Sequence, residues 1–106
     1  MSRPEFYDRE GRPLTTCQWA RLMERPFDEY RRVAQTDVGA DVLVSTVWLG
    51  IDYSFGLGPP LIFETMIFNG SWEGQDCWRW PTEEAALAGH DQAVEWMRFQ
   101  VAHEAM

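Results

Sequence analysis

A single carboxylate, Glu64, lies within the otherwise apolar stretch LIFETMIF at residues 61–68. His90 lies on the apolar stripe of the last helical segment, where it could act as a general base near neutral pH. The commoner role for such a histidine is a hydrogen bond to a strand. Asp52 and Asp76 are the other carboxylates near the strand-like stretches, and two carboxylates brought together could bind a metal ion or form an acid–base pair. Aspartates at strand ends more often stabilise turns.

The motifs that would turn these residues into a known reaction centre are missing from the sequence. Ser45, Thr46 and Cys77 lie in strand-like contexts, not on the strained strand-to-helix turn of a nucleophile elbow. The segment GLGPP precedes a strand and does not open a helix, so it lacks the context of a phosphate-binding loop. Cys17 and Cys77 form no CxxC pair, and no histidine has zinc-ligand spacing. We therefore predict no catalytic residue, no metal and no cofactor.

A ligand pocket could still form between the sheet and the last helix. Its predicted lining residues are Thr46, Trp48, Asp52, Glu64 and His90. Such a pocket requires Glu64 and His90 to lie on the same face of the sheet. If they lie on opposite faces, a shared site is excluded.

Capping residues and hydrophobic period predict the elements that would position these side chains. Thr15 as N-cap and Gln18 three residues later form a capping box that starts a short helix, and Pro26 ends it. Strand patterns follow in YRRVAQTDV (30–38), VLVSTVWLGI (42–51), LIFETMIF (61–68) and DCWRW (76–80), joined by short connections. A final helix begins at Pro81 and Thr82, and its apolar stripe is Leu87, His90, Val94, Met97 and Val101.

The order of these elements predicts the fold class. Short connections between successive strands favour an antiparallel meander. We predict one α+β domain over residues 1–106, with a short N-terminal helix, a four-stranded antiparallel meander and a C-terminal helix packed on the sheet.

Both central strands are apolar on both sides. In residues 42–51 and 61–68, neither set of alternating positions is polar throughout. Two helices can hardly cover both faces of four strands, so a second copy, a partner protein or a ligand should cover the remainder. The alternative is that the N-terminal lead-in and the Gly/Pro-rich loop fold back over that face.

Aromatic side chains exceed what a core of this size requires. Trp96 and Phe99 lie off the main stripe of the last helix, and Trp72 and Trp78 lie near the last strand. Because aromatic residues anchor protein interfaces, we predict that these four contact another chain. The alternative for the helix residues is a wide core face.

Charge narrows the choice of partner. The formal net charge is -8, with +1 on residues 1–36 and -9 on residues 37–106. This balance argues against nucleic acid, because affinity for phosphate backbones comes mostly from Lys and Arg. A cationic partner could be steered to the acidic part, which could also act as a decoy for a DNA-binding protein. The simplest alternative is a solvated acidic surface.

The sequence also bears on location. The start lacks the apolar core of a signal peptide, and the uncharged runs at 42–51 and 53–63 are shorter than the ~20 residues of a membrane helix. We expect no membrane contact and a cytoplasmic protein, with Cys17 and Cys77 as buried or half-buried thiols. All nine basic residues are arginine, which suggests a GC-rich genome.

Five segments carry a family resemblance: YDREGRPLTTCQWARL, RRVAQTD, VSTVWLGID, PLIFETMIF and TEEAALAGH. They resemble a family of small, functionally uncharacterised proteins of actinobacteria and their phages, and VSTVWLG with IFETM is the most specific part. The resemblance implies a phage or prophage accessory protein and carries no activity or site residue. With the sheet pattern, it predicts a non-enzymatic module in the host cytoplasm that binds a host protein or forms a homodimer. The alternative is a small-ligand binder or enzyme.

Overall fold

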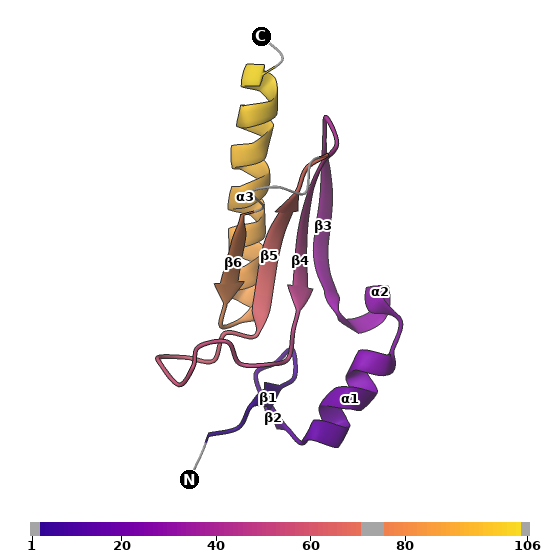
Figure 1. Ribbon diagram of the computed structural model, residues 1–106, viewed down its shortest axis with the longest axis vertical. Coiled ribbons are helices and arrows are strands. Elements are labelled where there is room, and N and C mark those ends of the chain that lie inside the picture. The colour runs from indigo at the N-terminus through magenta and orange to yellow at the C-terminus, as the bar shows by residue number, and fades with distance from the viewer. Residues whose placement is uncertain (1–2, 71–75, 105–106) are drawn as a thin grey trace.

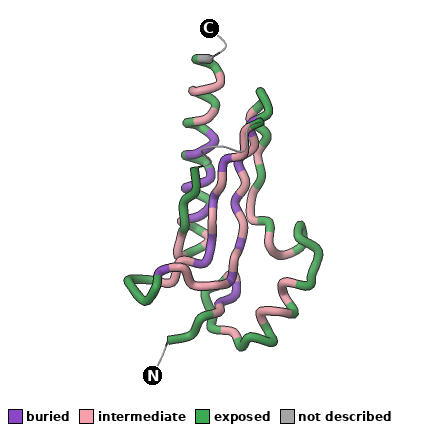
Figure 2. Tube along the Cα trace, in the orientation of Figure 1, coloured by how far each residue is buried: buried purple, intermediate pink, exposed green. Residues whose placement is uncertain are grey.

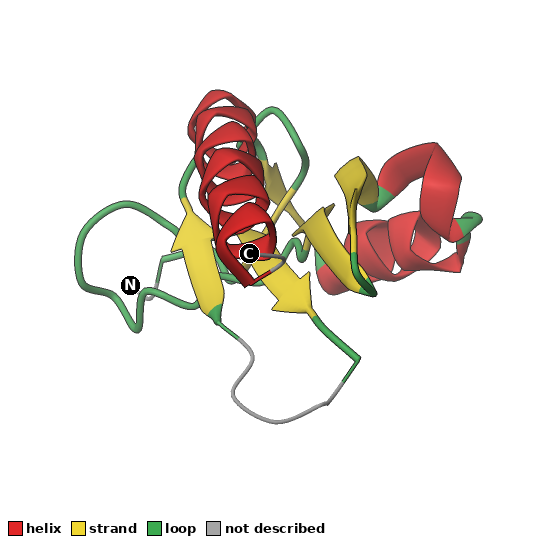
Figure 3. Ribbon diagram, turned by 90° about the horizontal axis from the view of Figure 1, so that it is seen from above, coloured by secondary structure: helices red, strands yellow, loops and turns green. Residues whose placement is uncertain are grey.

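The computed structural model describes residues 3–70 and 76–104 and has the predicted α+β architecture. Its elements, in chain order, are β1 (Phe6–Tyr7), β2 (Pro13–Leu14), α1 (Thr16–Glu24), α2 (Phe27–Tyr30), β3 (Arg32–Gly39), β4 (Val42–Trp48), β5 (Phe63–Phe68), β6 (Cys77–Trp80) and α3 (Glu83–Glu104). Strands β3 to β6 form an antiparallel sheet in sequence order. Helix α3 packs on one face of this sheet, and α1 and α2 lie beside the end near β3 (Figures 1 and 3). The predicted meander with a C-terminal helix is confirmed.

The capping box of the first helix is present. The hydroxyl of Thr15 accepts a hydrogen bond from the Gln18 N–H at 3.1 Å, and the Gln18 side chain accepts one from the Thr15 N–H at 2.9 Å. The β1–β2 hairpin and the single turn of α2 were not predicted, because elements of two to four residues are too short to show a period.

Burial alternates along the central strands, so the sheet has one buried face and one half-buried face. Val44 pairs with Ile67, and Trp48 with Phe63, all buried beneath α3. Figure 2 shows the buried positions concentrated on β4, β5 and the adjoining side of α3. The alternate positions on the other face are intermediate in exposure.

The stripe of α3 is rotated from the predicted one. His90 and Val94 are buried as expected, but Leu87 is 41% exposed. Ala86 and Ala93 are buried instead. Small side chains let the helix axis approach the sheet closely. Because the alanine side of α3 meets the sheet, the side chain of Leu87 points partly into solvent.

The N-terminal lead-in folds back onto the ends of the central strands. Phe6 bridges Ile51, and the Tyr7 N–H donates to the Gly50 carbonyl at 2.8 Å. The indole of Trp48, 1% exposed, donates to the Tyr7 carbonyl at 3.0 Å. The lead-in therefore folds back onto the end of the sheet, whereas the alternative prediction placed it over the sheet face that the helices leave uncovered.

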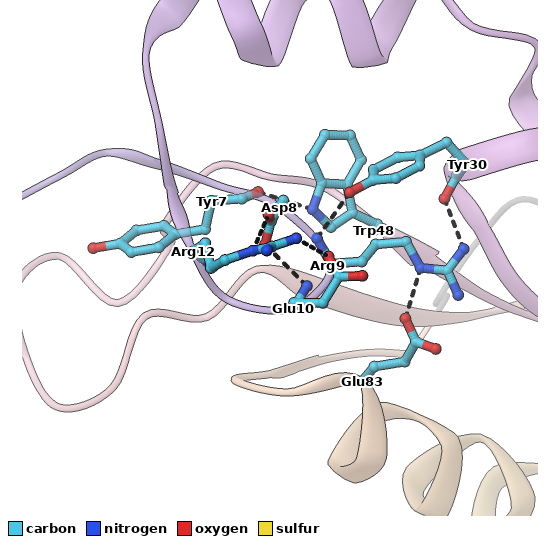
Figure 4. A network of polar contacts seen from close by, with 8 residues as sticks. All are labelled: Tyr7, Asp8, Arg9, Glu10, Arg12, Tyr30, Trp48 and Glu83. Carbon is cyan, nitrogen blue, oxygen red and sulfur yellow. Dashed lines mark hydrogen bonds and ion pairs between the residues drawn. The ribbon is translucent and has the colours of Figure 1, made fainter.

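A polar network joins the N-terminal lead-in to α2 and to the start of α3 (Figure 4). Arg9 donates to Glu83 at the start of α3 at 2.6 Å, and to the Tyr30 carbonyl at 3.1 Å. Asp8 accepts from the backbone N–H of Arg12 at 2.8 Å and from its guanidinium at 2.9 Å, which closes the β1–β2 turn. This network connects α2, the lead-in and α3.

Among residues 3–70 and 76–104, no helix combines the length and the apolarity needed to cross a membrane.

Candidate functional site

His90 is the centre of a buried hydrogen-bonded chain beneath α3. Its Nδ1 lies 2.8 Å from the Thr46 hydroxyl, and its Nε2 lies 2.9 Å from the Thr36 hydroxyl. The hydroxyls of Thr46 and Thr65 are 2.6 Å apart. Thr65 also accepts from the indole N–H of Trp80 at 3.0 Å. The structure thus brings together two of the predicted ligand-binding residues, Thr46 and His90.

The chain of hydrogen bonds favours neutral His90. In the arrangement that uses each linking hydroxyl once as acceptor and once as donor, Thr65 donates to Thr46, and Thr46 donates to Nδ1. The proton on Nε2 then donates to Thr36. Burial disfavours the imidazolium and lowers the pKa of His90, opposed only weakly by Asp91. With both ring nitrogens engaged and 3% exposure, His90 serves the core rather than a substrate.

Glu64 lies on the other face of the sheet from His90. It alternates with Thr65 along β5 and pairs with Arg79 across to β6. Arg79 donates to the Glu64 carboxylate at 3.1 Å, and its guanidinium also lies 4.5 Å from the ring centroid of Tyr53. A pocket shared by Glu64 and His90 is therefore excluded, and the charge within LIFETMIF belongs to a half-exposed ion pair.

Asp52 stabilises the loop that follows β4. Its carboxylate accepts from the backbone N–H groups of Ser54 at 2.7 Å and Leu61 at 3.1 Å, and pairs with Arg3 at 2.9 Å. Burial works against the charge, but these hydrogen bonds and Arg3 outweigh it and lower the pKa of Asp52. Asp52 contacts neither Glu64 nor His90. It stabilises a turn, as aspartates at strand ends commonly do.

The prediction of buried cysteines is wrong, because Cys17 and Cys77 are both exposed. On the open face, Cys77 is the neighbour of Glu64. Partial burial of the thiol and the adjacent carboxylate raise the pKa of Cys77 to about 11. Its thiol is therefore protonated at neutral pH, which makes it a poor nucleophile.

Replacing Glu64 by glutamine should speed alkylation of Cys77. Removing the carboxylate lowers the pKa of the thiol, and each pKa unit gives about tenfold more thiolate. We expect a severalfold increase in the iodoacetamide rate at about pH 8, measured by mass spectrometry in a Cys17→Ser background. The matched control, Glu95→Gln, removes an exposed charge on α3 and should leave the rate unchanged. Equal rates in both variants would contradict this account.

A pocket lined by tryptophan lies between β6, the last strand of the sheet, and α3. Trp78 and Trp80 alternate with Arg79, so both indoles project to the face that carries α3. Gly89, Gln92, Ala93 and Trp96 complete the lining of this tryptophan pocket, whose volume is about 200 Å³. The exposed fractions of Trp78 and Trp96 are 38% and 45%.

Gly89 makes the tryptophan pocket possible. A Cβ at this position would overlap the six-membered ring of Trp80, so that the indole of Trp80 rests on the bare helix backbone. Trp80 is held by its bond to Thr65 and forms the fixed floor, whereas Trp78 and Trp96 form the open walls. None of the predicted ligand-binding residues lines this pocket.

The predicted interface residues fall into three groups. Trp78 and Trp96 meet in the tryptophan pocket. Phe99 is 57% exposed and lies against His103, with ring centroids 4.3 Å apart. Trp72 lies outside the described residues. The sequence pattern indicated that Gly89 lets the helix approach the sheet closely, but it did not place Gly89 and Ala93 in a pocket, although their spacing of four residues, with Trp96 three further on, places all three on one side of a helix.

Comparisons with protein-family models, curated proteins and solved structures found no match to this chain.

Proposed function

We propose that this chain is a non-enzymatic protein-binding module whose partner inserts a side chain into the tryptophan pocket. The observation that carries the proposal is the pair of open indoles, Trp78 and Trp96, held over the fixed floor of Trp80. Tryptophan is among the residues that most often dominate binding energy at protein interfaces. Phe99, one turn along α3 from Trp96, extends the exposed aromatic surface.

The size of the tryptophan pocket favours a side chain over a free metabolite. Its volume of about 200 Å³ is smaller than the range of roughly 300–1,000 Å³ that is usual for small-molecule sites. One long side chain fits this space while the rest of the partner contacts the rim.

Chemistry favours a cationic side chain, arginine foremost. Indole faces attract guanidinium and ammonium groups, and Gln92 supplies a carbonyl oxygen that can accept from them. The net charge of -8, concentrated after residue 36, would steer a basic partner toward this part of the chain. The proposed partner is therefore a protein that presents an exposed arginine.

The biological setting belongs to the same proposal. The family resemblance supports an accessory protein of phage type that acts on a host protein in the cytoplasm. Enclosure of His90 by threonine hydroxyls supports binding over catalysis, because its ring nitrogens are already engaged.

Capture from an actinobacterial lysate, with variants as baits, tests the proposal. The double variant Trp78→Ala/Trp96→Ala should lose at least tenfold of the protein that the wild type retains, because both walls are removed. The control Phe55→Ala/Leu57→Ala removes two other exposed apolar side chains, which are 87% and 81% exposed, and should capture as the wild type does. Added arginine should compete with the captured protein more strongly than added leucine. Equal capture by both double variants would refute the proposal.

A second candidate is a homodimer formed through the sheet face opposite α3. Leu43, Val47 and Met66 are half-buried on this face, and α3 covers only the other face (Figure 3). Light scattering over a concentration series tests it: the wild type should shift from monomer to dimer, and Met66→Glu should stay monomeric. A wild type that stays monomeric at high concentration would remove this candidate.

A further inference from the structure

A second, separate cavity lies between the α1–α2 segment and the end of β4 with the residues that follow it. We call it the Arg31 groove. Its volume is about 310 Å³, and its lining consists of Trp19, Met23, Phe27, Arg31, Val47, Trp48, Leu49, Ile51 and Tyr53. Unlike the tryptophan pocket, it reaches the lower end of the usual size range of small-molecule sites, which are mostly apolar with a few placed polar groups.

Arg31 is the only charged residue in this lining. Its backbone carbonyl accepts from the Trp48 N–H at 2.7 Å, which fixes the residue at the junction of α2 and β3. Its guanidinium carbon lies 5.0 Å from the ring centroid of Phe27. The Nε–H is buried and has no hydrogen-bond acceptor among residues 3–70 and 76–104.

Five of the eight other arginines differ from Arg31 in forming an ion pair, whereas Arg21, Arg32 and Arg98 form none among the described residues. Arg3, Arg9, Arg12, Arg25 and Arg79 each form an ion pair with a carboxylate. Within the part of the chain that the structure describes, Arg31 pairs with no carboxylate. A buried charged donor without an acceptor is unfavourable, and a ligand that supplies the acceptor removes that penalty.

The donor and the lining together define the chemistry of the ligand. The planar guanidinium matches a carboxylate, which can accept from Nε and a terminal nitrogen in parallel. A single cation balances a single negative charge. The remaining lining is apolar except for indole N–H and phenol O–H groups. The indole N–H of Trp19 already donates to the Leu49 carbonyl at 3.2 Å.

We infer that the Arg31 groove binds a small monocarboxylate with an apolar body, such as a medium-chain fatty acid. The carboxylate pairs with Arg31 and the apolar body lies along Met23, Val47 and Leu49. This site is separate from the tryptophan pocket, because the two linings share no residue.

Calorimetric titration of the full chain with sodium decanoate, at submicellar concentrations, tests the inference. We expect one decanoate per chain, and at least tenfold weaker binding to Arg31→Gln, because a charge-assisted pair is lost. The matched control is Arg32→Gln. Its guanidinium carbon lies 5.5 Å from the same Phe27 ring, but the residue does not line the groove, so it should bind decanoate as the wild type does. Decanol should bind the wild type and Arg31→Gln equally weakly.

The outcomes separate this inference from the proposed function. Trp78→Ala/Trp96→Ala should bind decanoate with wild-type affinity even though it loses the protein partner. If Arg31→Gln fails to fold, the Arg31 Nε–H resonance of the wild type should still shift downfield as decanoate is added. Equal binding to the two arginine variants, decanol binding as tight as decanoate, no binding of decanoate, or an unmoved Nε–H resonance would each overturn the inference.

Discussion

Replacing Gly50 by alanine should lower the free energy of unfolding by about 2–5 kcal/mol, from two separate contributions. Gly50 has φ +75°, a conformation in which a side chain adds about 1–2 kcal/mol of strain. An added Cβ would also overlap the Trp48 ring and lie 2.6 Å from the Trp19 indole nitrogen. Overpacking of this kind usually costs about 1–3 kcal/mol.

A second glycine separates the two contributions. Gly58 has φ +77°, and a Cβ added there would meet nothing within 4 Å. Gly58→Ala should therefore show the backbone strain alone, and urea denaturation of both variants would give the packing contribution by difference. Equal losses of unfolding free energy in the two variants would mean that Trp19 and Trp48 move to accommodate the added Cβ at Gly50 without destabilising the fold. A larger loss in Gly50→Ala confirms that α1 docks directly on the backbone after β4.

Acidification should destabilise the protein through His90. The folded-state pKa is lowered from its ordinary value of 6.5, so below that pH the unfolded chain takes up a proton that the folded chain does not. The free energy of unfolding therefore falls as pH drops from 6.5 toward the lowered pKa, and it is fully retained above 6.5.

The variant His90→Leu tests this account by its stability at neutral pH and by the change of that stability with pH. At about pH 7.5 it should be destabilised by roughly 1–3 kcal/mol, because the Thr36 and Thr46 hydroxyls lose their buried partner. Between about pH 6.5 and 5 its stability should change less than that of the wild type, since the titrating group is gone. His103→Gln, which retains His90, should keep the acid-induced loss. Adding Thr36→Val to His90→Leu should recover stability, because an unpaired hydroxyl is removed with its partner.

Two results would contradict this account of His90. If His90→Leu keeps the wild-type pH profile, then the proton is taken up elsewhere. If Thr36→Val/His90→Leu is less stable than His90→Leu, the Thr36 hydroxyl is not left unpaired by the loss of the histidine.

Local sequence signals predicted the elements well where the signal lies within one element. The capping box at Thr15 and the meander from 32 to 80 depend on neighbouring residues along the chain, and both are present. The rotation of α3 could not be predicted, because it depends on Trp80 resting on Gly89, a contact between two elements. The alternation of side chains along a strand placed Glu64 and Thr65 on opposite faces of the sheet. Only the packing of the elements shows which face meets α3 and His90.

The candidate sites were harder to predict for the same reason. Trp78 and Trp96 were predicted as interface residues from composition, yet their convergence on one pocket requires the β6–α3 geometry. Arg31 carried no sequence signal, since its significance comes from a buried Nε–H without an acceptor.

The bond from Arg9 to Glu83 has a consequence for folding during synthesis. These residues are 74 positions apart, so the ribosome must make most of the chain before the lead-in meets its partner on α3. The sheet strands follow one another directly and can pair as they emerge, because local contacts form before distant ones. The hairpin order of β3 to β6 thus allows the sheet to assemble first, and closure of the lead-in against α3 completes the native state after the last helix leaves the ribosome.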